Sequence, residues 1–276
     1  MGIAAEIADD IAEDWHAALA ALAWQVDAGV DEVIGDAPVN RYDLAAVAPK
    51  SVAATSAPPT FAPQQQPAQI AAPVPAADPA AAARAVADAA ETLDALRQAI
   101  TAFDLCELKR GARNTVFAEG NTAARVLVLG EAPGADEDRE GRPFVGTAGQ
   151  LLDKMFAAIG LSRTSPDAGT SFYVTSILPW RPPGNRDPDP GEIAMMLPFV
   201  LRHVALVDPA VIVVMGNAPL EAMTGQTSIL RARGTWMQAL GKPVLPMTHP
   251  AYLLKNPAAK REAWVDLLAL QARLRG

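Results

Sequence analysis

The sequence predicts an α/β domain with three layers, in which helices cover both faces of a central, mostly parallel sheet of about four strands. Three observations lead to this fold class. Short, continuous apolar segments at 125–130, 172–178, 211–215 and 244–248 indicate strands, and segments with helical periodicity separate them. Strands that do not alternate between apolar and polar residues are typical of parallel sheets buried on both faces.

The helices between these strands have recognisable ends. Thr147 and Gln150 have the spacing of a capping box, which predicts a helix from 147 to Gly160. Asp189 followed by Pro190 predicts the start of a second helix, which we expect to run to about Val207. The pair at 256–257, Asn followed by Pro, opens a last helix, and residues 80–103 are also helical in pattern.

The N-terminal part differs from this domain in composition. Residues 1–45 are acidic, and apolar residues recur at helical spacing within 4–28, so we expect a helical segment there. Eight prolines among Ala, Gln, Ser and Thr lie between Pro49 and Pro79. Such a stretch has little to bury, so residues 46–79 are predicted to form a disordered linker, and 80–276 the folded domain.

Charge is spread unevenly along the chain, whose net charge is −8. Residues 1–95 hold three basic and 14 acidic groups, a charge of −11, whereas 96–276 hold 20 basic and 17 acidic groups, a charge of +3. A weakly basic body with an acidic arm is compatible with a polyanionic partner. The sequence offers no partner for the arm itself.

Several classes of protein and site are disfavoured. No apolar run reaches the ~18 residues of a membrane span, and the N-terminus lacks the basic and apolar regions of a signal peptide. We therefore expect a cytoplasmic protein that does not bind membranes. The single cysteine excludes an internal disulfide, a cysteine-based zinc site and an all-cysteine iron–sulfur site.

Polar and glycine residues follow the predicted strands: Gly130 and Glu131, Ser176, the pair at 216–217, and His249. Ligands of parallel sheets bind beyond the carboxyl ends of the strands. We therefore expect these residues to share one rim of the sheet.

The densest of these stretches is 130–149, in which two glycine-rich loops flank an acidic cluster. A phosphate-binding loop is excluded, because no Gly-Lys-Ser/Thr follows and the acids would repel phosphate. A solvated acidic loop before a helix remains an alternative. Against it, Glu131 directly follows a buried strand, where a carboxylate is costly unless it has a role, and Phe144 among glycines suggests a platform for a flat ligand.

Three motifs in order now indicate a family: Gly-Glu-Ala-Pro-Gly at 130–134 with Gly-Arg-Pro-Phe-Val-Gly-Thr-Ala-Gly-Gln-Leu-Leu at 141–152, Arg-Pro-Pro-Gly-Asn-Arg at 181–186, and His-Pro-Ala-Tyr-Leu-Leu at 249–254. Together they resemble the motifs of family 4 uracil-DNA glycosylases. The resemblance runs from about Phe103 to Leu274, and residues 1–100 have no counterpart.

The resemblance implies hydrolysis of the N-glycosidic bond of uracil in DNA, after the base is flipped out of the helix into a pocket. Phe144 would stack on the uracil, His249 would donate a hydrogen bond to the negative charge developing on uracil O2, and Glu131 would hold or activate the attacking water. The resemblance also places Gly130, Ala132 and Glu137 at the substrate.

Contacts with DNA are expected from two segments. The proline-rich loop 179–190 carries Arg181, Asn185 and Arg186, whose cationic side chains and backbone N–H groups suit phosphates. Leu253 and Leu254 are candidates for an apolar wedge that fills the gap left by the flipped base, and ordinary core residues are the alternative. His16 and His203 lie on predicted helices and are interpreted as structural.

The chain departs from family 4 at the cluster ligands. Members hold a four-iron, four-sulfur cluster on four cysteines, and the motif alignment puts Phe103, Cys106, Trp180 and Met196 at those positions. One thiolate cannot hold the cluster, so we expect no iron–sulfur cluster, no other metal and an apolar plug in its place.

The second departure is Ser176, where the family usually has Asn. A carboxamide pairs with both O4 and N3–H of uracil, whereas one hydroxyl satisfies only one of them well.

The leading hypothesis is a monomeric, monofunctional uracil-DNA glycosylase of base excision repair, since no lysine is placed for a lyase step. The alternative is a glycosylase-like DNA-binding protein with weak turnover or a shifted preference among deaminated bases. A polymerase is disfavoured because no carboxylates are spaced for two metal ions.

Overall fold

The computed structural model describes Leu19 and residues 78–275. The predicted N-terminal helical segment and the linker therefore lie almost entirely outside the described residues, and their assignments stay predictions. The described domain begins at Pro79, where a helix starts, one residue before the predicted start of the folded domain.

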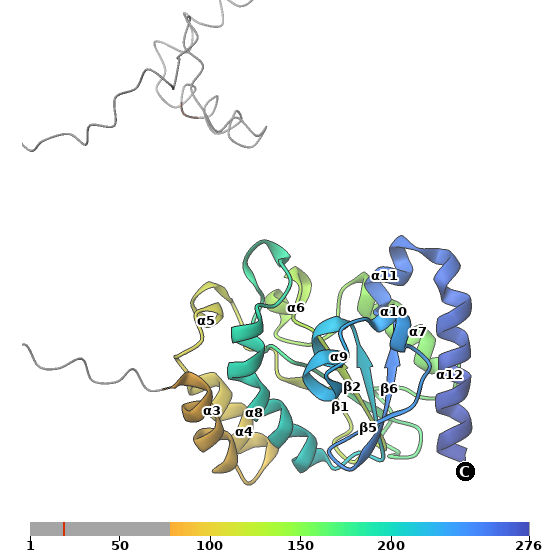
Figure 1. Ribbon diagram of the computed structural model, residues 1–276, viewed down its shortest axis with the longest axis horizontal. Coiled ribbons are helices and arrows are strands. Elements are labelled where there is room, and N and C mark those ends of the chain that lie inside the picture. Colours follow the sequence, from red (N-terminus) through yellow and green to blue (C-terminus); the bar gives the residue numbers. More distant parts are fainter. Residues whose placement is uncertain (1–18, 20–77, 276) are drawn as a thin grey trace, which may run out of the picture. The chain divides into compact units, whose positions relative to one another are not determined.

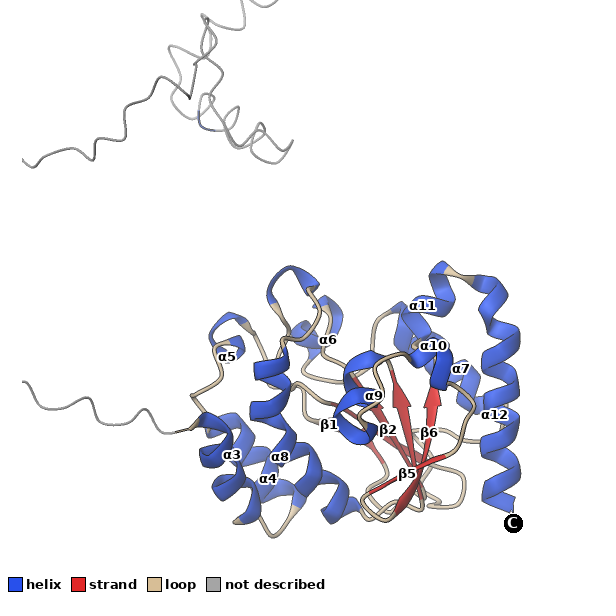
Figure 2. Cartoon of the chain, in the orientation of Figure 1, coloured by secondary structure: helices blue, strands red, loops and turns tan. Residues whose placement is uncertain are grey.

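A six-stranded mixed sheet forms the centre of this domain, in the order β1-β3-β2-β4-β6-β5 (Figures 1 and 2). Four parallel strands make its middle: β2 (Val126–Gly130), β3 (Phe172–Ser176), β4 (Val211–Met215) and β6 (Lys242–Met247). They are the four strands that the apolar segments predict. The edges are β1 (Ala118–Gly120) and β5 (Met237–Ala239), both antiparallel to their neighbours. Three residues leave no periodicity to detect, which is why sequence reasoning missed both edge strands.

Side chains of the parallel strands alternate between two apolar cores. Leu127 and Leu129 of β2 pack in the core shared with α3 (Pro79–Asp88), α4 (Leu93–Ala102) and α8 (Pro190–Val207). Val126 and Val128 pack in the core shared with α7 (Thr147–Ala157) and α12 (Lys260–Arg275). Figure 1 shows these two groups of helices on opposite sides of the sheet. The fold is therefore the predicted three-layer α/β/α class.

Helices α3 and α4 take the place of the single helix predicted over 80–103. Thr92 caps α4 by accepting a hydrogen bond from the N–H of Ala95, so the chain starts a second helix there. Ala83 and Ala87 of α3 are fully buried, and Arg202 of α8 donates to the carbonyl of Ala90 at 2.7 Å. This helix pair is therefore an integral part of the domain.

Helix α8 begins as expected, with Asp189 as its N-cap and Pro190 in its first turn, and the side chains of Asp189 and Glu192 form a capping box. It has the length and the mean hydropathy, 1.3, of a membrane span, and within the described residues it is the one helix that does. Its apolar character has another cause here, since it packs against α3, α4 and the sheet.

The start of α7 differs from the prediction. Gly146 is the N-cap, Thr147 is the first helical residue, and no side chain caps this end. The prediction of a capping box formed by Thr147 and Gln150 is therefore wrong. The N–H of Gly146 instead donates to the carboxylate of Glu137 in the preceding helix, α6 (Ala135–Glu140), so the cap belongs to the loop structure around Phe144.

The remaining helices described are short and lie between the longer elements: α5 (Leu108–Gly111), η1 (Pro183–Asn185), α9 (Asn217–Thr224), α10 (Ile229–Ala232), α11 (Pro250–Lys255) and η2 (Pro257–Ala259). Helices α9 and α11 start directly beyond the carboxyl ends of β4 and β6, which places their N-termini at the rim expected to bind a ligand.

Candidate active site

A pocket of about 240 Å³ opens at the carboxyl ends of the parallel strands. Of the residues expected at the rim of the sheet, Glu131, Ser176 and His249 line this pocket, whereas the pair at 216–217 lines a neighbouring cavity. The pocket is also lined by Ala132, Glu137 and Phe144, with Asn185 and Arg186 of the proline-rich loop. Gly130 does not line it but lies against Phe144, since an added Cβ would be 2.6 Å from that ring.

Phe144 lies on a loop between α6 and α7 in a left-handed conformation, with φ of 53°. Its ring is 5.4 Å from that of His249, centroid to centroid, and lies over the backbone of Gly130. Helix α7 approaches so closely that any side chain at Gly149 would collide with the carbonyl of Phe144. Glycine at both positions is therefore required for the ring to take this place in the pocket wall.

Glu137 organises the same loop. One carboxylate oxygen accepts from the N–H groups of Val145 and Gly146 at 2.9 and 3.0 Å, and the other accepts from the N–H of Gly134 at 3.0 Å. The side chain therefore joins both glycine-rich loops. It lies beside the pocket, where the resemblance places it, but its acceptors are used by the backbone.

Glu131 follows β2 and reaches across to α9, where its carboxylate accepts from the N–H of Ala218 at 3.1 Å. Gly216 makes this possible, because a Cβ there would lie 2.5 Å from a carboxylate oxygen, and its φ of 112° suits glycine alone. Burial raises the pKa of Glu131 above the usual carboxyl range, since the ionised form is poorly solvated.

His249 is the N-cap of α11. Its Nδ1 accepts a hydrogen bond from the N–H of Ala251 at 3.1 Å. Burial lowers the pKa of His249 to about 4, so the ring is neutral at pH 7. Because Nδ1 is the acceptor, the single ring proton lies on Nε2. The neutral imidazole can therefore donate a hydrogen bond from Nε2 to a ligand in the pocket.

Ser176 ends β3 directly opposite Gly130 of β2 in the parallel register. Its hydroxyl oxygen lies 3.4 Å from the position that a Cβ on Gly130 would take. Ser176 lines the pocket, and among the described residues its hydroxyl makes no hydrogen bond.

The proline-rich loop forms the outer wall of the pocket through Pro182, Asn185, Arg186 and the following pair, Asp187 and Pro188. Its cations are held by local partners. Arg181 donates to Oδ1 of Asn185 at 2.7 Å and does not line the pocket, and Arg186 forms a two-pronged ion pair with Glu192 of α8. The loop is therefore braced against the domain before any DNA binds.

The two leucines proposed as the wedge, Leu253 and Leu254, differ in burial. Leu253 is buried, with 1% of its surface exposed, and lies under α11 among residues of α7 and α12. Its predicted contact with DNA is therefore wrong, because the side chain belongs to the core. Leu254 is 42% exposed and stays available as the wedge.

Sequence reasoning missed a second cavity, of about 300 Å³, on the other side of Glu131 and His249. Gly216, Asn217, Ser228 and Tyr252 are among the other residues that line it. The Gly-Asn pair after β4 was the available signal, but the α9–α10 loop that completes the cavity carries no recognisable motif.

Comparison with known proteins assigns the family. The model of the uracil DNA glycosylase superfamily matches residues 117–268, more than half of the chain. The protein belongs to the uracil DNA glycosylase superfamily. Among curated relatives, the type-4 uracil-DNA glycosylase of Thermotoga maritima is 36% identical over 169 residues, which cover 60% of this chain and 85% of the relative. That of Archaeoglobus fulgidus is 36% identical over 181 residues, which cover 62% and 88%.

A further relative carries another name. A protein of Bacillus phage SP01 called DNA polymerase is 32% identical over 158 residues, which cover 57% of this chain but only 17% of the phage protein. The match is thus limited to a small part of that protein. It gives no ground for a polymerase activity in this superfamily member.

The cluster positions inferred for this uracil DNA glycosylase superfamily member do not fit an iron–sulfur cluster. Phe103, Cys106, Trp180 and Met196 are all at most 5% exposed and lie in one apolar core, and Cys106 is the single cysteine of the chain. Trp180 donates from Nε1 to the hydroxyl of Thr115 at 3.1 Å, so its one polar atom is satisfied. One thiolate among apolar side chains cannot replace four cysteine ligands.

Proposed function

We propose that this protein is a monofunctional uracil-DNA glycosylase, which hydrolyses the N-glycosidic bond of uracil in DNA and leaves an abasic site. The observation that carries the proposal is the pocket that brings together Phe144, a neutral His249 and Glu131. The curated relatives named type-4 uracil-DNA glycosylases support it. The target base is flipped out of the stack to reach the pocket, because its glycosidic bond is inaccessible inside a duplex.

His249 serves the departing base. As the glycosidic bond breaks, electrons move onto uracil and negative charge grows on O2. A neutral imidazole with its proton on Nε2 donates to that oxygen, while Nδ1 stays fixed by the N–H of Ala251. The donor is placed before the reaction, so it stabilises the transition state without reorganisation.

Glu131 serves the sugar. Cleavage leaves positive charge on the deoxyribose, and a carboxylate beside it lowers the energy of that state and orients the attacking water. The water's oxygen forms the new bond to the anomeric carbon, uracil leaves with the bonding electrons, and the water's proton passes to the carboxylate and then to solvent. The hydrogen bond from Ala218 fixes the direction of the carboxylate.

Phe144 and Ser176 select the base. The aromatic ring stacks on uracil, and the hydroxyl at the end of β3 faces the edge that distinguishes uracil from cytosine. A hydroxyl satisfies O4 or N3–H but not both, so we expect slower uracil release than a carboxamide at this position would give.

DNA is expected to contact the proline-rich loop and Leu254. Asn185 and Arg186 line the pocket, Arg181 lies on the same loop, and the cationic side chains of the two arginines suit phosphates. Leu254 is exposed on α11, five residues after His249, and is proposed to fill the gap left by the flipped base. We further propose that the protein acts as a cytoplasmic monomer.

The residues at the inferred cluster positions lead us to propose that no iron–sulfur cluster and no metal take part. Purified protein is then expected to be colourless and free of stoichiometric iron. A visible iron–sulfur absorption band would show that the cluster positions are assigned wrongly.

The deciding experiment incubates the protein with a labelled uracil-containing oligonucleotide and EDTA, then cleaves abasic sites with alkali. Strand cleavage that requires both uracil and the alkali step supports a monofunctional, metal-independent glycosylase. Cleavage without alkali would indicate a lyase.

Ser176 favours a second candidate, a DNA-binding protein with weak turnover or one that acts on another deaminated base. Binding of uracil-containing DNA without base release, or release of hypoxanthine or xanthine in preference to uracil, would support this alternative.

A further inference from the structure

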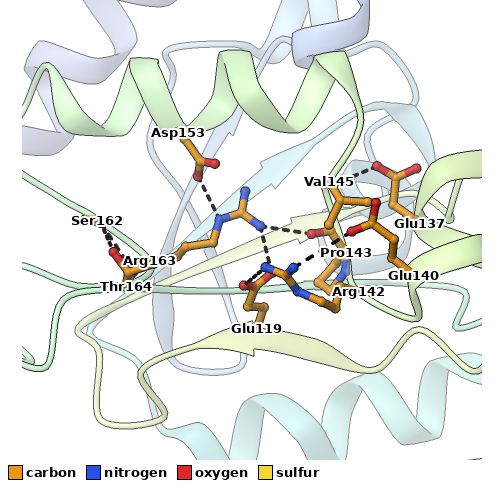
Figure 3. A network of polar contacts seen from close by, with 10 residues as sticks. All are labelled: Glu119, Glu137, Glu140, Arg142, Pro143, Val145, Asp153, Ser162, Arg163 and Thr164. Atoms are coloured by element: carbon orange, nitrogen blue, oxygen red, sulfur yellow. Dashed lines mark hydrogen bonds and ion pairs between the residues drawn. The ribbon is translucent and has the colours of Figure 1, made fainter.

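Behind the Phe144 loop lies a further polar cavity, of about 400 Å³. A guanidinium, that of Arg163, is buried beside it, with 5% of the side chain exposed. Figure 3 shows this side chain between a helix, an edge strand and the loop. Burying a cation costs free energy, because it loses its hydration, unless oppositely charged groups and hydrogen-bond acceptors surround it.

Arg163 lies on the loop between α7 and β3 and contacts three separate elements. Its Nε donates to Asp153 of α7 at 2.7 Å, and its Nη1 donates to Glu119 of β1 at 3.2 Å and to the carbonyl of Pro143 at 2.9 Å. Its Nη2 is buried without a hydrogen-bond partner among the described residues. The orientation of the guanidinium is therefore set by these three bonds.

The bond to Pro143 is the one that bears on the site. Pro143 immediately precedes Phe144, whose φ of 53° is unfavourable for a residue with a side chain. On the other side of Phe144, the N–H of Val145 donates to Glu137. The peptide groups before and after Phe144 are thus both held, one by Arg163 from behind and one by Glu137 from the pocket side.

An anion-binding role for this cavity is disfavoured. Glu119, Glu140 and Asp153 line it together with Arg142 and Arg163, so carboxylates outnumber the cations. Arg142 bonds to Glu119 at 2.5 Å and lies within 3.9 Å of Glu140, so neighbouring carboxylates balance its charge. The charges are used internally, as a brace between the loop and the domain.

We propose that Arg163 is a positioning residue that holds Phe144 in the left-handed conformation required for stacking on the base. The proposal rests on the function proposed above, and it adds a residue outside the pocket that determines how well the base is bound. Arg163 touches neither substrate nor reacting atoms and acts through the carbonyl of Pro143.

The variant Arg163→Met tests this, because methionine keeps the apolar stem but removes every donor. We expect kcat/KM on uracil-containing DNA to fall about 10- to 100-fold, as for a small displacement of a positioned group. Inhibition by free uracil should weaken in the same proportion. Arg163→Lys keeps the charge near Asp153 but cannot bridge three acceptors, so its kcat/KM should lie between those of wild type and Arg163→Met. If Arg163→Met does not fold, Arg163→Lys serves as the test variant.

Arg233 provides the matched control. It is another largely buried arginine, 17% exposed, whose Nε donates to Asp266 at 2.9 Å and whose Nη2 donates to the carbonyl of Glu262 at 2.7 Å, outside the pocket. Arg233→Met should lower thermal stability without changing uracil inhibition. An equal loss of uracil inhibition in both variants would overturn the proposal, because Arg163 would then be merely structural.

A double-mutant cycle shows whether the effect passes through Phe144. In a Phe144→Ala background, Arg163→Met should cause no further loss of kcat/KM, since there is no ring left to position. Full additivity of the two losses would overturn the proposal.

Fluorine NMR of protein labelled with 4-fluorophenylalanine gives a readout that does not depend on activity. The Phe144 resonance, assigned by its absence in Phe144→Leu, should shift or broaden in Arg163→Met and stay unchanged in Arg233→Met. An unchanged resonance in both would refute the positioning role even if the wild type releases no uracil, whereas a shifted resonance in an inactive protein would refute only the proposed function.

Discussion

Replacing Ser176 with asparagine tests the substrate assignment most directly. Ser176 ends β3 opposite Gly130 and lines the pocket of about 240 Å³, which can hold a longer side chain at this point. A carboxamide there supplies an acceptor for N3–H and a donor for O4 of uracil, whereas the present hydroxyl serves one of them. The variant therefore adds one hydrogen bond to the base.

That hydrogen bond is worth about 1–3 kcal/mol when the alternative is an unpaired group in a buried site. At 1.4 kcal/mol per factor of ten, we expect Ser176→Asn to raise uracil excision about 5- to 150-fold. Selectivity against cytosine should rise too, because cytosine presents an amino donor at C4 and no N3–H.

The measurement is single-turnover cleavage of matched uracil- and cytosine-containing oligonucleotides, with Ser176→Ala as the control that removes the hydroxyl and adds nothing. A lower rate on uracil together with a lower rate on another deaminated base would show that the pocket is tuned to that base. Unchanged rates in both variants would refute the placement of this residue at the base.

Other predictions concern charge and catalysis. His249→Ala should lower uracil release by about 10²- to 10³-fold in single-turnover assays, as expected for one lost transition-state donor, while the circular dichroism spectrum stays native. Burial raises the pKa of Glu131, so the folded state holds this proton more tightly than the unfolded chain does, and stability falls as the pH rises from the usual carboxyl pKa through the raised one. Glu131→Gln should therefore melt at a higher temperature than wild type at a pH above the raised pKa, and at the same temperature at a pH well below the usual carboxyl pKa. A difference in melting temperature that does not change with pH would contradict the shifted pKa. Deleting residues 1–77, which carry ten acidic and two basic groups, should leave a folded domain that binds DNA more tightly at low salt, with the gain lost at high salt. Equal affinity of the deleted and full-length proteins at low salt would show that the acidic arm does not compete with DNA.

Deletion at residue 95, which the charge boundary alone suggests, would remove α3 and cut into α4. Ala83, Ala87 and Leu96 are fully buried in the core shared with α8. Composition shows where charge changes, but only packing shows where a domain begins.

The parallel strands and the rim of the sheet were predictable because each is a property of a short stretch of sequence. Val211–Met215 is apolar throughout, and Gly130, Ser176 and His249 directly follow apolar segments. The carboxyl ends of parallel strands lie at the same edge of a sheet whatever the details of packing. Local sequence patterns were therefore enough to predict that these residues lie near one another.

The rest depended on contacts between distant residues. Leu253 and Leu254 are adjacent in sequence, and only the packing of α11 against α7 and α12 decides which one is buried. Gly146 replaces Thr147 as the cap of α7 because Glu137, nine residues earlier, binds its N–H. The brace formed by Arg163 spans 44 residues to Glu119, and no motif marks it.

The two short edge strands have a consequence for behaviour in concentrated solution. Exposed sheet edges are templates on which other chains add as strands, and β1 and β5 present only three residues each. Beyond Val244, where the pairing with β5 ends, β6 contains Pro246, which has no N–H to offer, and the carbonyl of Pro246 already accepts from the N–H of Gly234. Both margins of the described sheet are therefore short, and Pro246 limits pairing along the rest of β6, which disfavours intermolecular strand addition there.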